Sequence, residues 1–171
     1  TQWVLGSVGG DATTIAATNK AYVPLLFGAK GFSFAPAPTD TTDEYIKLFQ
    51  SIYATAQPTQ TFDNNVVAGM SNAFVAVQAL QAAGSNLTRE GLMKTIEAKG
   101  ASFANPFLTP LGYSATSHVG ATGYWIGTYD PTGALKPDGG KYTVYTTDSG
   151  TGPVVESTYK RPAMPAKGLP N

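Results

Sequence analysis

The sequence predicts an α/β protein with helices in its middle and strands toward both ends. Apolar residues recur at helical spacing between residues 41 and 99. Apolar and polar residues alternate over 124–129 and 141–146, as in strands with one buried face. A short apolar run over residues 3–5 ends in glycine and predicts a further buried strand. The order of strand, helix, strand, three helices and β meander is unusual for one complete domain.

The first of the three helices is predicted to begin near residue 41. Thr41 and Glu44 stand three residues apart, which is the spacing of a capping box. A single apolar stripe then follows at positions i, i+3, i+4 and i+7. The stripe consists of Tyr45, Leu48, Phe49 and Ile52.

The second and third helices are predicted over residues 64–83 and 88–99. The second is rich in alanine, carries few charges and is stopped by Gly84. Thr88 is the expected N-cap of the third helix, and Gly100 the residue just after its end. Alanine-rich helices with few charges, like the second one, are expected to pack closely and to be buried over much of their circumference.

The remaining elements are extended. The segment 31–38 alternates Phe32 and Phe34 with small residues before two prolines, which predicts a strand that leaves its sheet. The stretch 124–146 predicts a hairpin or meander. Residues 149–171 are rich in Gly and Pro and predict an extended tail.

Composition excludes several classes of protein. Eleven basic residues balance eleven acidic ones, and only 13% of the chain is charged. Nucleic acid and acidic lipid both require clustered positive charge, so neither is an expected partner. The absence of cysteine excludes disulfides and thiolate metal sites. The sequence shows no signal peptide and no apolar stretch that we expect to span a membrane.

The glycine-rich loop after residue 5 is the first candidate site. Its G-S-V-G-G spacing differs from G-x-G-x-x-G, and no lysine follows as in a P-loop, so phosphate binding is disfavoured. Two interpretations remain open, a tight turn or a solute site built from Ser7, backbone N–H groups and Asp11. Asp11 itself can either cap the next helix or pair with a ligand amine.

No catalytic group, metal site or cofactor site is predicted. Gly69-Met70-Ser71-Asn72-Ala73 only loosely resembles a nucleophile elbow, and Ser71 falls inside a predicted helix. His118 is the only histidine and sits in a loop without a nucleophile context, so a hydrolase using Ser71 or His118 is the weakest hypothesis. Of six aromatic residues, we expect most to lie in the core. Some are expected to line a pocket, because small-molecule sites are largely apolar and aromatic. The six are Phe32, Phe34, Phe62, Tyr113, Tyr124 and Trp125.

The chain as a whole resembles the C-terminal part of a periplasmic solute-binding protein of the branched-chain amino-acid (leucine/isoleucine/valine) type. Four segments carry the resemblance in order along the chain. They are WVLGSVGGD, YVPLLFGAKGFSFAPAP, SNAFVAVQALQAAGSNLTREGLMKTIEAKG and LTPLGYSATSHVGATGYWIGTYDPTG. Each is similar to a strand, loop or helix of that family.

The resemblance implies an incomplete type I periplasmic-binding fold, with two α/β lobes joined by crossing strands. Residues 1–35 are then part of the second lobe, and 36–108 are the helical part of the first lobe. Residues 109–171 supply a crossing strand, the second-lobe meander and the tail. We therefore expect a missing N-terminal portion of the same protein to complete both lobes.

The resemblance also implies a function without catalysis or cofactor. Such proteins trap a small solute between their lobes and deliver it to a membrane ABC permease, in the periplasm or from a lipid anchor on the extracellular face. A ligand-sensing receptor domain of the same fold is the alternative. The expected ligand-binding residues are Ser7, Val8, Gly9, Gly10 and Asp11, with Phe34, Tyr113 and His118 as cleft lining.

Val8 departs from the family pattern. Amino-acid binders place an acid for the ligand ammonium in this loop, and by simple alignment that acid falls at Val8. An amino acid, an aromatic or apolar acid and an amide are therefore comparable candidates for the solute. The open question is whether Asp11 replaces the missing acid.

Overall fold

The computed structural model describes residues 1–6, 10–85, 87–146 and 152–166 of the chain. The α-helices are α1 (Ala12–Asn19), α2 (Glu44–Ala56), α3 (Asn64–Ala83) and α4 (Arg89–Lys99). The 3-10 helices are η1 (Lys20–Leu26), η2 (Gly100–Ser102) and η3 (Asp138–Gly140). The strands are β1 (Lys30–Ser33), β2 (Gly123–Tyr129), β3 (Leu135–Pro137), β4 (Val144–Thr146) and β5 (Val155–Glu156).

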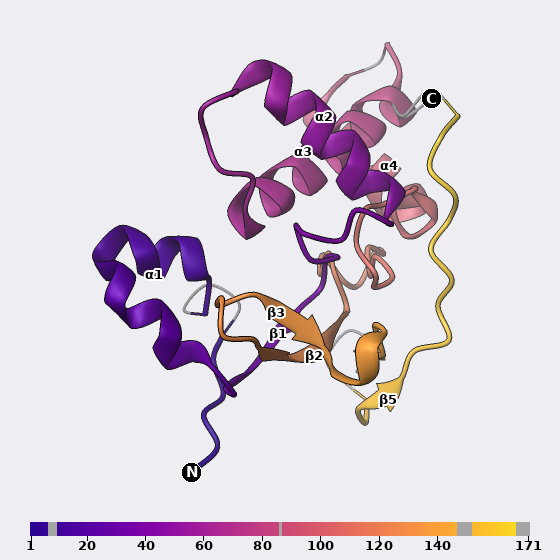
Figure 1. The fold of residues 1–171 in the computed structure, drawn as a ribbon. Helices are drawn as coiled ribbons and strands as arrows, with labels where there is room; N and C mark the ends of the chain where they lie inside the picture. Colours follow the sequence, from indigo (N-terminus) through magenta and orange to yellow (C-terminus); the bar gives the residue numbers. More distant parts are fainter. Residues whose placement is uncertain (7–9, 86, 147–151, 167–171) are drawn as a thin grey trace.

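These elements form two bodies (Figure 1). The helical body contains α2, α3 and α4. The sheet body contains the five strands, with α1 and η1 beside them. Each body has its own core: Ile46, Val67 and Phe107 lie in that of the helical body, and Leu26 and Tyr129 in that of the sheet body.

The sheet is antiparallel, in the order β1-β2-β4-β5, with β3 also paired to β2. Its register places Phe32 opposite Ile126 and Trp125 opposite Val144. Along β2 the buried residues are every second one, because successive side chains point to opposite faces of a strand. The predicted meander is therefore confirmed, and β5 adds a strand to it from the expected tail.

Residues 3–5 do not form the predicted buried strand. Val4 makes one parallel bridge to Lys30, on the side of β1 away from β2. Trp3 and Val4 are each 68% exposed. The prediction is wrong because an apolar run is buried only where another layer covers it, and this run pairs only at the edge of the sheet.

The N-cap of α2 is Asp43, so the predicted capping box of Thr41 and Glu44 is wrong. Asp43 Oδ1 accepts from the backbone N–H groups of Tyr45 at 3.0 Å and Ile46 at 3.1 Å. The helix begins later than predicted because Asp40 forms a turn before it. The Asp40 carboxylate accepts from the N–H and the hydroxyl of Thr42. Glu44 instead accepts from the Met164 N–H.

The bounds predicted for α3 are confirmed, and Gly84 ends it with φ of 67°. Among the described residues, α3 alone is long and apolar enough to cross a membrane. By these two criteria, length and composition, our expectation that the chain has no such stretch is wrong. This helix buries Val67 and Phe74 within the helical body.

Thr88 caps α4 as predicted, whereas Gly100 has a helical φ of −58° and leads into η2.

Three segments connect the two bodies (Figure 1). Residues 34–43 run from β1 to α2, residues 103–122 run from η2 to β2, and the segment after β5 returns along the helices. This last segment stays extended, as predicted, but it is anchored. Arg161 forms an ion pair with Asp43, and Asn105 donates to the Tyr159 hydroxyl at 2.9 Å.

Candidate functional site

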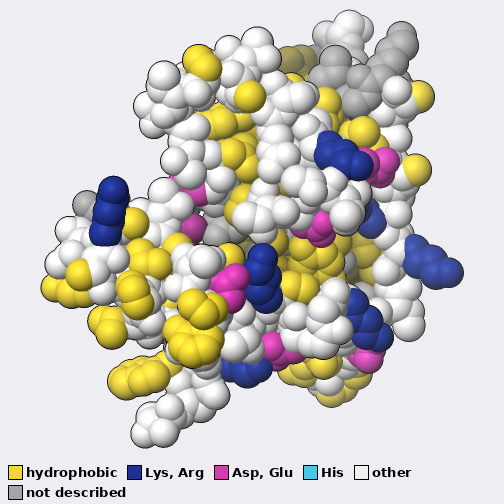
Figure 2. All heavy atoms as spheres, in the orientation of Figure 1, with side chains coloured by type: hydrophobic (Ala, Val, Ile, Leu, Met, Phe, Trp, Pro, Cys, Tyr) yellow, Lys and Arg dark blue, Asp and Glu magenta, His cyan; other side chains and the backbone are white. Residues whose placement is uncertain are grey.

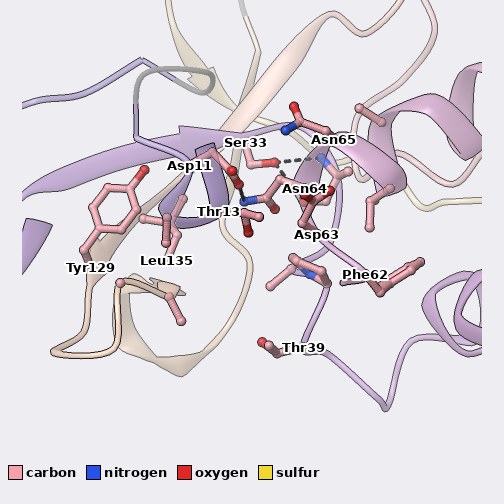
Figure 3. Close-up of a pocket in the computed structure, with 18 of the residues that line it drawn as sticks. Asp11, Thr13, Ser33, Thr39, Phe62, Asp63, Asn64, Asn65, Tyr129 and Leu135 are labelled. Atoms are coloured by element: carbon pink, nitrogen blue, oxygen red, sulfur yellow. Dashed lines mark hydrogen bonds between the residues drawn. The ribbon is translucent and has the colours of Figure 1, made fainter. Parts of the chain in front are cut away.

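A cavity of about 340 Å³ lies between the two bodies. The sheet body contributes the start of α1, β1, the end of β2 and the turn into β3. The helical body contributes the start of α3 and the segment before α2. In Figure 3, Asp11, Thr13, Asp63 and Asn64 gather at its centre, with Tyr129 and Phe62 on opposite sides. The volume suits a small organic molecule.

Two helices begin at this cavity, and an aspartate caps each of them. Asp11 Oδ1 accepts from the Thr14 N–H at 2.8 Å and caps α1. Asp63 Oδ1 accepts from the Val66 N–H at 2.9 Å and caps α3. Each carboxylate satisfies backbone donors that the helix leaves free and offsets the positive end of its dipole. The cavity is therefore lined by two acids.

Asp11 also bridges the two bodies. Its second oxygen, Oδ2, accepts from Asn64 Nδ2 at 2.9 Å, and Asn65 Nδ2 lies 3.3 Å from the Thr14 hydroxyl. Asp11 is only 3% exposed. A buried carboxylate is tolerated only when it is hydrogen-bonded, and here its donors come from both α1 and α3.

Aromatic side chains form the apolar walls. Phe32 packs on Tyr124 with ring centroids 5.4 Å apart, and Phe34 packs edge-on against Phe107 at 5.3 Å. Trp125 is fixed by a hydrogen bond from Nε1 to the Ala35 carbonyl at 2.8 Å. These contacts hold the rings in place, so the walls are formed before any solute enters.

Tyr129 stands against Asp11 because two glycines leave room for its ring. A Cβ on Gly10 would collide with the Tyr129 hydroxyl, and a Cβ on Gly31 would lie 2.7 Å from ring carbon Cε2. Burial raises the pKa of the Tyr129 phenol, and the Asp11 carboxylate raises it further. The phenol is thus kept neutral beside the acid.

Only some of the predicted site residues line this cavity in the structure. Asp11 and Phe34 line the cavity. Ser7, Val8 and Gly9 lie outside the described residues. Gly10 is buried against Tyr129 and is not among the described lining residues.

Tyr113 and His118 lie away from this cavity, because residues 110–122 fold back as a hairpin onto the helical body. Tyr113 lines a second, apolar cavity of about 290 Å³ beside α3 and α4. His118 Nε2 lies 3.2 Å from Glu97 Oε1 on α4.

The geometry gives no catalytic role to Ser71. The residue is fully buried in the middle of α3, whereas a nucleophile must reach a substrate. Among the residues that the structure describes, no three His, Cys, Asp or Glu side chains are grouped to hold a metal ion.

Sequence reasoning missed the contribution of α3. Asn64 and Asn65 were assigned only to the start of a helix, yet both line the cavity together with Asp63. The signal was the polar run Asp-Asn-Asn over residues 63–65, at the start of an apolar helix. Two amides beyond the cap exceed what capping requires, and this excess could have marked the helix start as a binding surface.

A family model described as periplasmic binding protein matches residues 1–135. The chain belongs to the periplasmic binding protein family. The match covers most of the 171 residues and every cavity-lining residue within the described part of the chain. Comparison with curated proteins and with solved structures found no match.

Membership of the periplasmic binding protein family accounts for the mixture of helices and antiparallel sheet as part of a type I periplasmic-binding fold. The family binds small-molecule solutes outside the cytoplasm, and its members are generally not enzymes. A solute-binding role therefore belongs to this chain as well.

Proposed function

We propose that this periplasmic binding protein traps a small solute in the cavity between its two bodies and delivers it to a membrane ABC permease. The supporting observation is that one cavity of about 340 Å³ receives side chains from both bodies. A solute seated there contacts both at once, so binding couples to their relative movement. We place the protein in the periplasm or on a lipid anchor at the extracellular face.

The two bodies correspond to the proposed lobes. We assign residues 1–35, whose described part includes α1, η1 and β1, to the second lobe, and residues 36–108, which contain α2, α3 and α4, to the first lobe. Residues 109–171 cross back and supply β2 to β5. Within this last part, residues 110–122 pack on the helical body before the chain reaches β2.

Exposed apolar side chains support the proposal that a further, N-terminal portion of the same protein completes both lobes. Figure 2 shows hydrophobic side chains over the region of α1 and η1. Trp3, Leu25 and Phe27 are each more than 60% exposed in that body. On α3, Val77 and Leu80 are also exposed. Burying such groups is favourable by about 25 cal/mol per Å² of apolar surface.

A dye that fluoresces on exposed apolar surface tests this completion. We expect 1-anilinonaphthalene-8-sulfonate to bind this chain strongly and to be displaced when the N-terminal portion is supplied. Equal fluorescence with and without that portion would contradict the proposal.

Thermal shift with a solute panel, run on this chain with the N-terminal portion supplied, tests the solute-binding function. The panel contains amino acids, aromatic acids, aliphatic acids, amides and amines. A solute at a hundred times its dissociation constant adds about 2.7 kcal/mol of stability. For a domain of this size that is a rise in Tm of roughly 5 to 10 °C. If no compound of any class raises Tm, the proposed function is wrong.

A further inference from the structure

One wall of the cavity is a tight turn in the segment that runs from β1 to α2. Residues 37–39 line the cavity, and the Asp40 N–H donates to the Ala37 carbonyl at 2.9 Å. This is the hydrogen bond of a β-turn, and Pro38 occupies the position in such a turn that favours proline. The turn belongs to a segment that connects the two bodies, so contacts with either body can fix its position.

The sheet body holds this turn through Tyr142, which precedes β4. The Tyr142 hydroxyl accepts from the Ala37 N–H at 3.1 Å and donates to Asp40 Oδ2 at 2.9 Å. One hydroxyl therefore joins the first and last residues of the turn. The Tyr142 ring packs on the buried Trp125 ring with centroids 4.9 Å apart. The hydroxyl is thus carried by a ring that the sheet body keeps in place.

The helical body holds the same turn through Gln50 on α2. Gln50 Nε2 donates to the Pro38 carbonyl at 2.9 Å. Pro38 follows Ala37 in the turn, so this contact falls between the two that Tyr142 makes. Neither Gln50 nor Tyr142 is among the described residues that line the cavity. Both therefore act on the wall from outside the cavity.

We propose that Gln50 and Tyr142 are positioning residues for solute binding, because together they hold the turn 37–40 at the cavity from both bodies. The inference rests on the proposed function of the cavity. A wall that is held in place before the solute arrives does not have to be ordered during binding, and this raises affinity. Loss of either contact should therefore weaken binding without removing a group that lines the cavity.

Hydrogen exchange of single backbone amides tests whether these residues hold the wall, with no solute present. In Tyr142→Phe the ring remains but the hydroxyl is lost, so we expect the Ala37 and Asp40 amides to exchange at least fivefold faster. Tyr145→Phe is the matched control, because the Tyr145 hydroxyl on β4 has no hydrogen bond within the described part of the chain. It should leave both rates within twofold. Unchanged rates in Tyr142→Phe would overturn the inference.

Isothermal titration calorimetry tests whether the wall determines affinity, on this chain with the N-terminal portion supplied. The probe is L-leucine, phenylacetate or phenylacetamide, whichever raises Tm most, and the best compound of the solute panel replaces them if all three leave Tm unchanged. We expect Tyr142→Phe to weaken binding of the probe at least fivefold and Gln50→Met at least threefold. Methionine keeps the length of glutamine but donates no hydrogen bond. Undiminished affinity in either variant would overturn the role of that residue.

Two controls separate this role from a merely structural one. Lys47→Ala, one turn earlier on α2 at an exposed position, and Tyr145→Phe should leave affinity within twofold. Circular dichroism checks that every variant is folded at the temperature of the titration. A residue that only stabilises the fold would lower Tm and leave the affinity of the folded protein unchanged. Losses of affinity as large in the controls would overturn the inference.

The double variant of Gln50→Met and Tyr142→Phe tests whether the two residues hold one wall. Binding should weaken by less than the product of the two single losses, because a turn already released on one side loses little more on the other. Losses that multiply would overturn this claim. If a panel solute binds but both substitutions leave its affinity unchanged, this inference fails and the proposed function stands. If no panel solute raises Tm, the proposed function fails and the role in binding fails with it, whereas hydrogen exchange still decides whether the wall is held.

Discussion

Arg161, near the end of the described chain, forms an ion pair with Asp43, the residue that caps α2. The guanidinium also donates to the Pro106 carbonyl at 3.0 Å and stands 4.9 Å from the centre of the Tyr45 ring. Both charged groups are largely buried, at 17% and 7% exposure. The segment after β5 is therefore fixed to the helical body at a helix start.

Arg161→Ala should lower the free energy of unfolding by roughly 2 to 4 kcal/mol, because it leaves the buried Asp43 carboxylate without its cation. Urea unfolding measures the change. Lys160→Ala is the matched control, since the adjacent side chain is exposed and should cost less than about 0.5 kcal/mol. Equal losses in the two variants would show that the ion pair contributes nothing.

Tyr45→Phe should leave the protein as stable as before or make it more stable. The Tyr45 hydroxyl is buried and has no hydrogen-bond partner among the described residues. Its desolvation is therefore uncompensated, and removal costs no hydrogen bond. The ring, which packs edge-on against Phe74 with centroids 5.3 Å apart, is retained. A loss above about 1 kcal/mol in urea unfolding would reveal a partner for the hydroxyl.

Stability should fall as pH rises above 10. Burial raises the pKa of Tyr45 to about 12 and also raises that of Tyr142. In the unfolded chain tyrosine deprotonates near pH 10, so between pH 10 and 12 the unfolded state binds fewer protons than the folded state. The free energy of unfolding is therefore at its full value below pH 10 and falls as pH rises toward 12.

Urea unfolding at pH 8, 9, 10 and 11 measures this loss, and absorbance at 295 nm follows the phenolates. We expect part of the nine tyrosines to titrate only as the protein unfolds. In Tyr45→Phe the decline should be shallower. A single titration step near pH 10 in the folded protein would contradict the assignment.

Gly10→Ala should destabilise the protein because its Cβ would meet the Tyr129 hydroxyl. Overpacking of this kind costs about 1 to 3 kcal/mol. In a Tyr129→Phe background the cost should be smaller, since the colliding oxygen is gone. Gly6→Ala is the matched control, because nothing lies within 4 Å of its added Cβ. If the cost is the same in both backgrounds, Tyr129 is not the obstacle.

Local patterns predicted the helices well. The apolar period and Gly84 together located α3, and Thr88 located the start of α4, because caps and periodicity act over a few residues. The start of α2 was mislocated at Thr41 because Asp40 accepts the Thr42 N–H in a turn before the helix, and Asp43 accepts the Tyr45 N–H as the cap.

Features set by distant parts of the chain were harder to predict. Trp3 is exposed because no layer of the described structure covers it, and a short apolar run in the sequence does not show whether such a layer exists. Tyr113 and His118 lie outside the cavity because their hairpin folds onto α4 rather than toward Asp11. Asn64 meets Asp11 across 53 positions of sequence, a distance at which no local motif operates.

Whether the cavity between the two bodies binds the solute is tested most directly by filling it. Ala68 on α3 lines the cavity, whereas Ala73 on the same helix is exposed. Calorimetry with the tightest ligand of the solute panel should show loss of binding by at least tenfold in Ala68→Phe and none in Ala73→Phe, with both variants folded by circular dichroism. Undiminished binding in Ala68→Phe would contradict the account, because the solute would then occupy some other part of the protein.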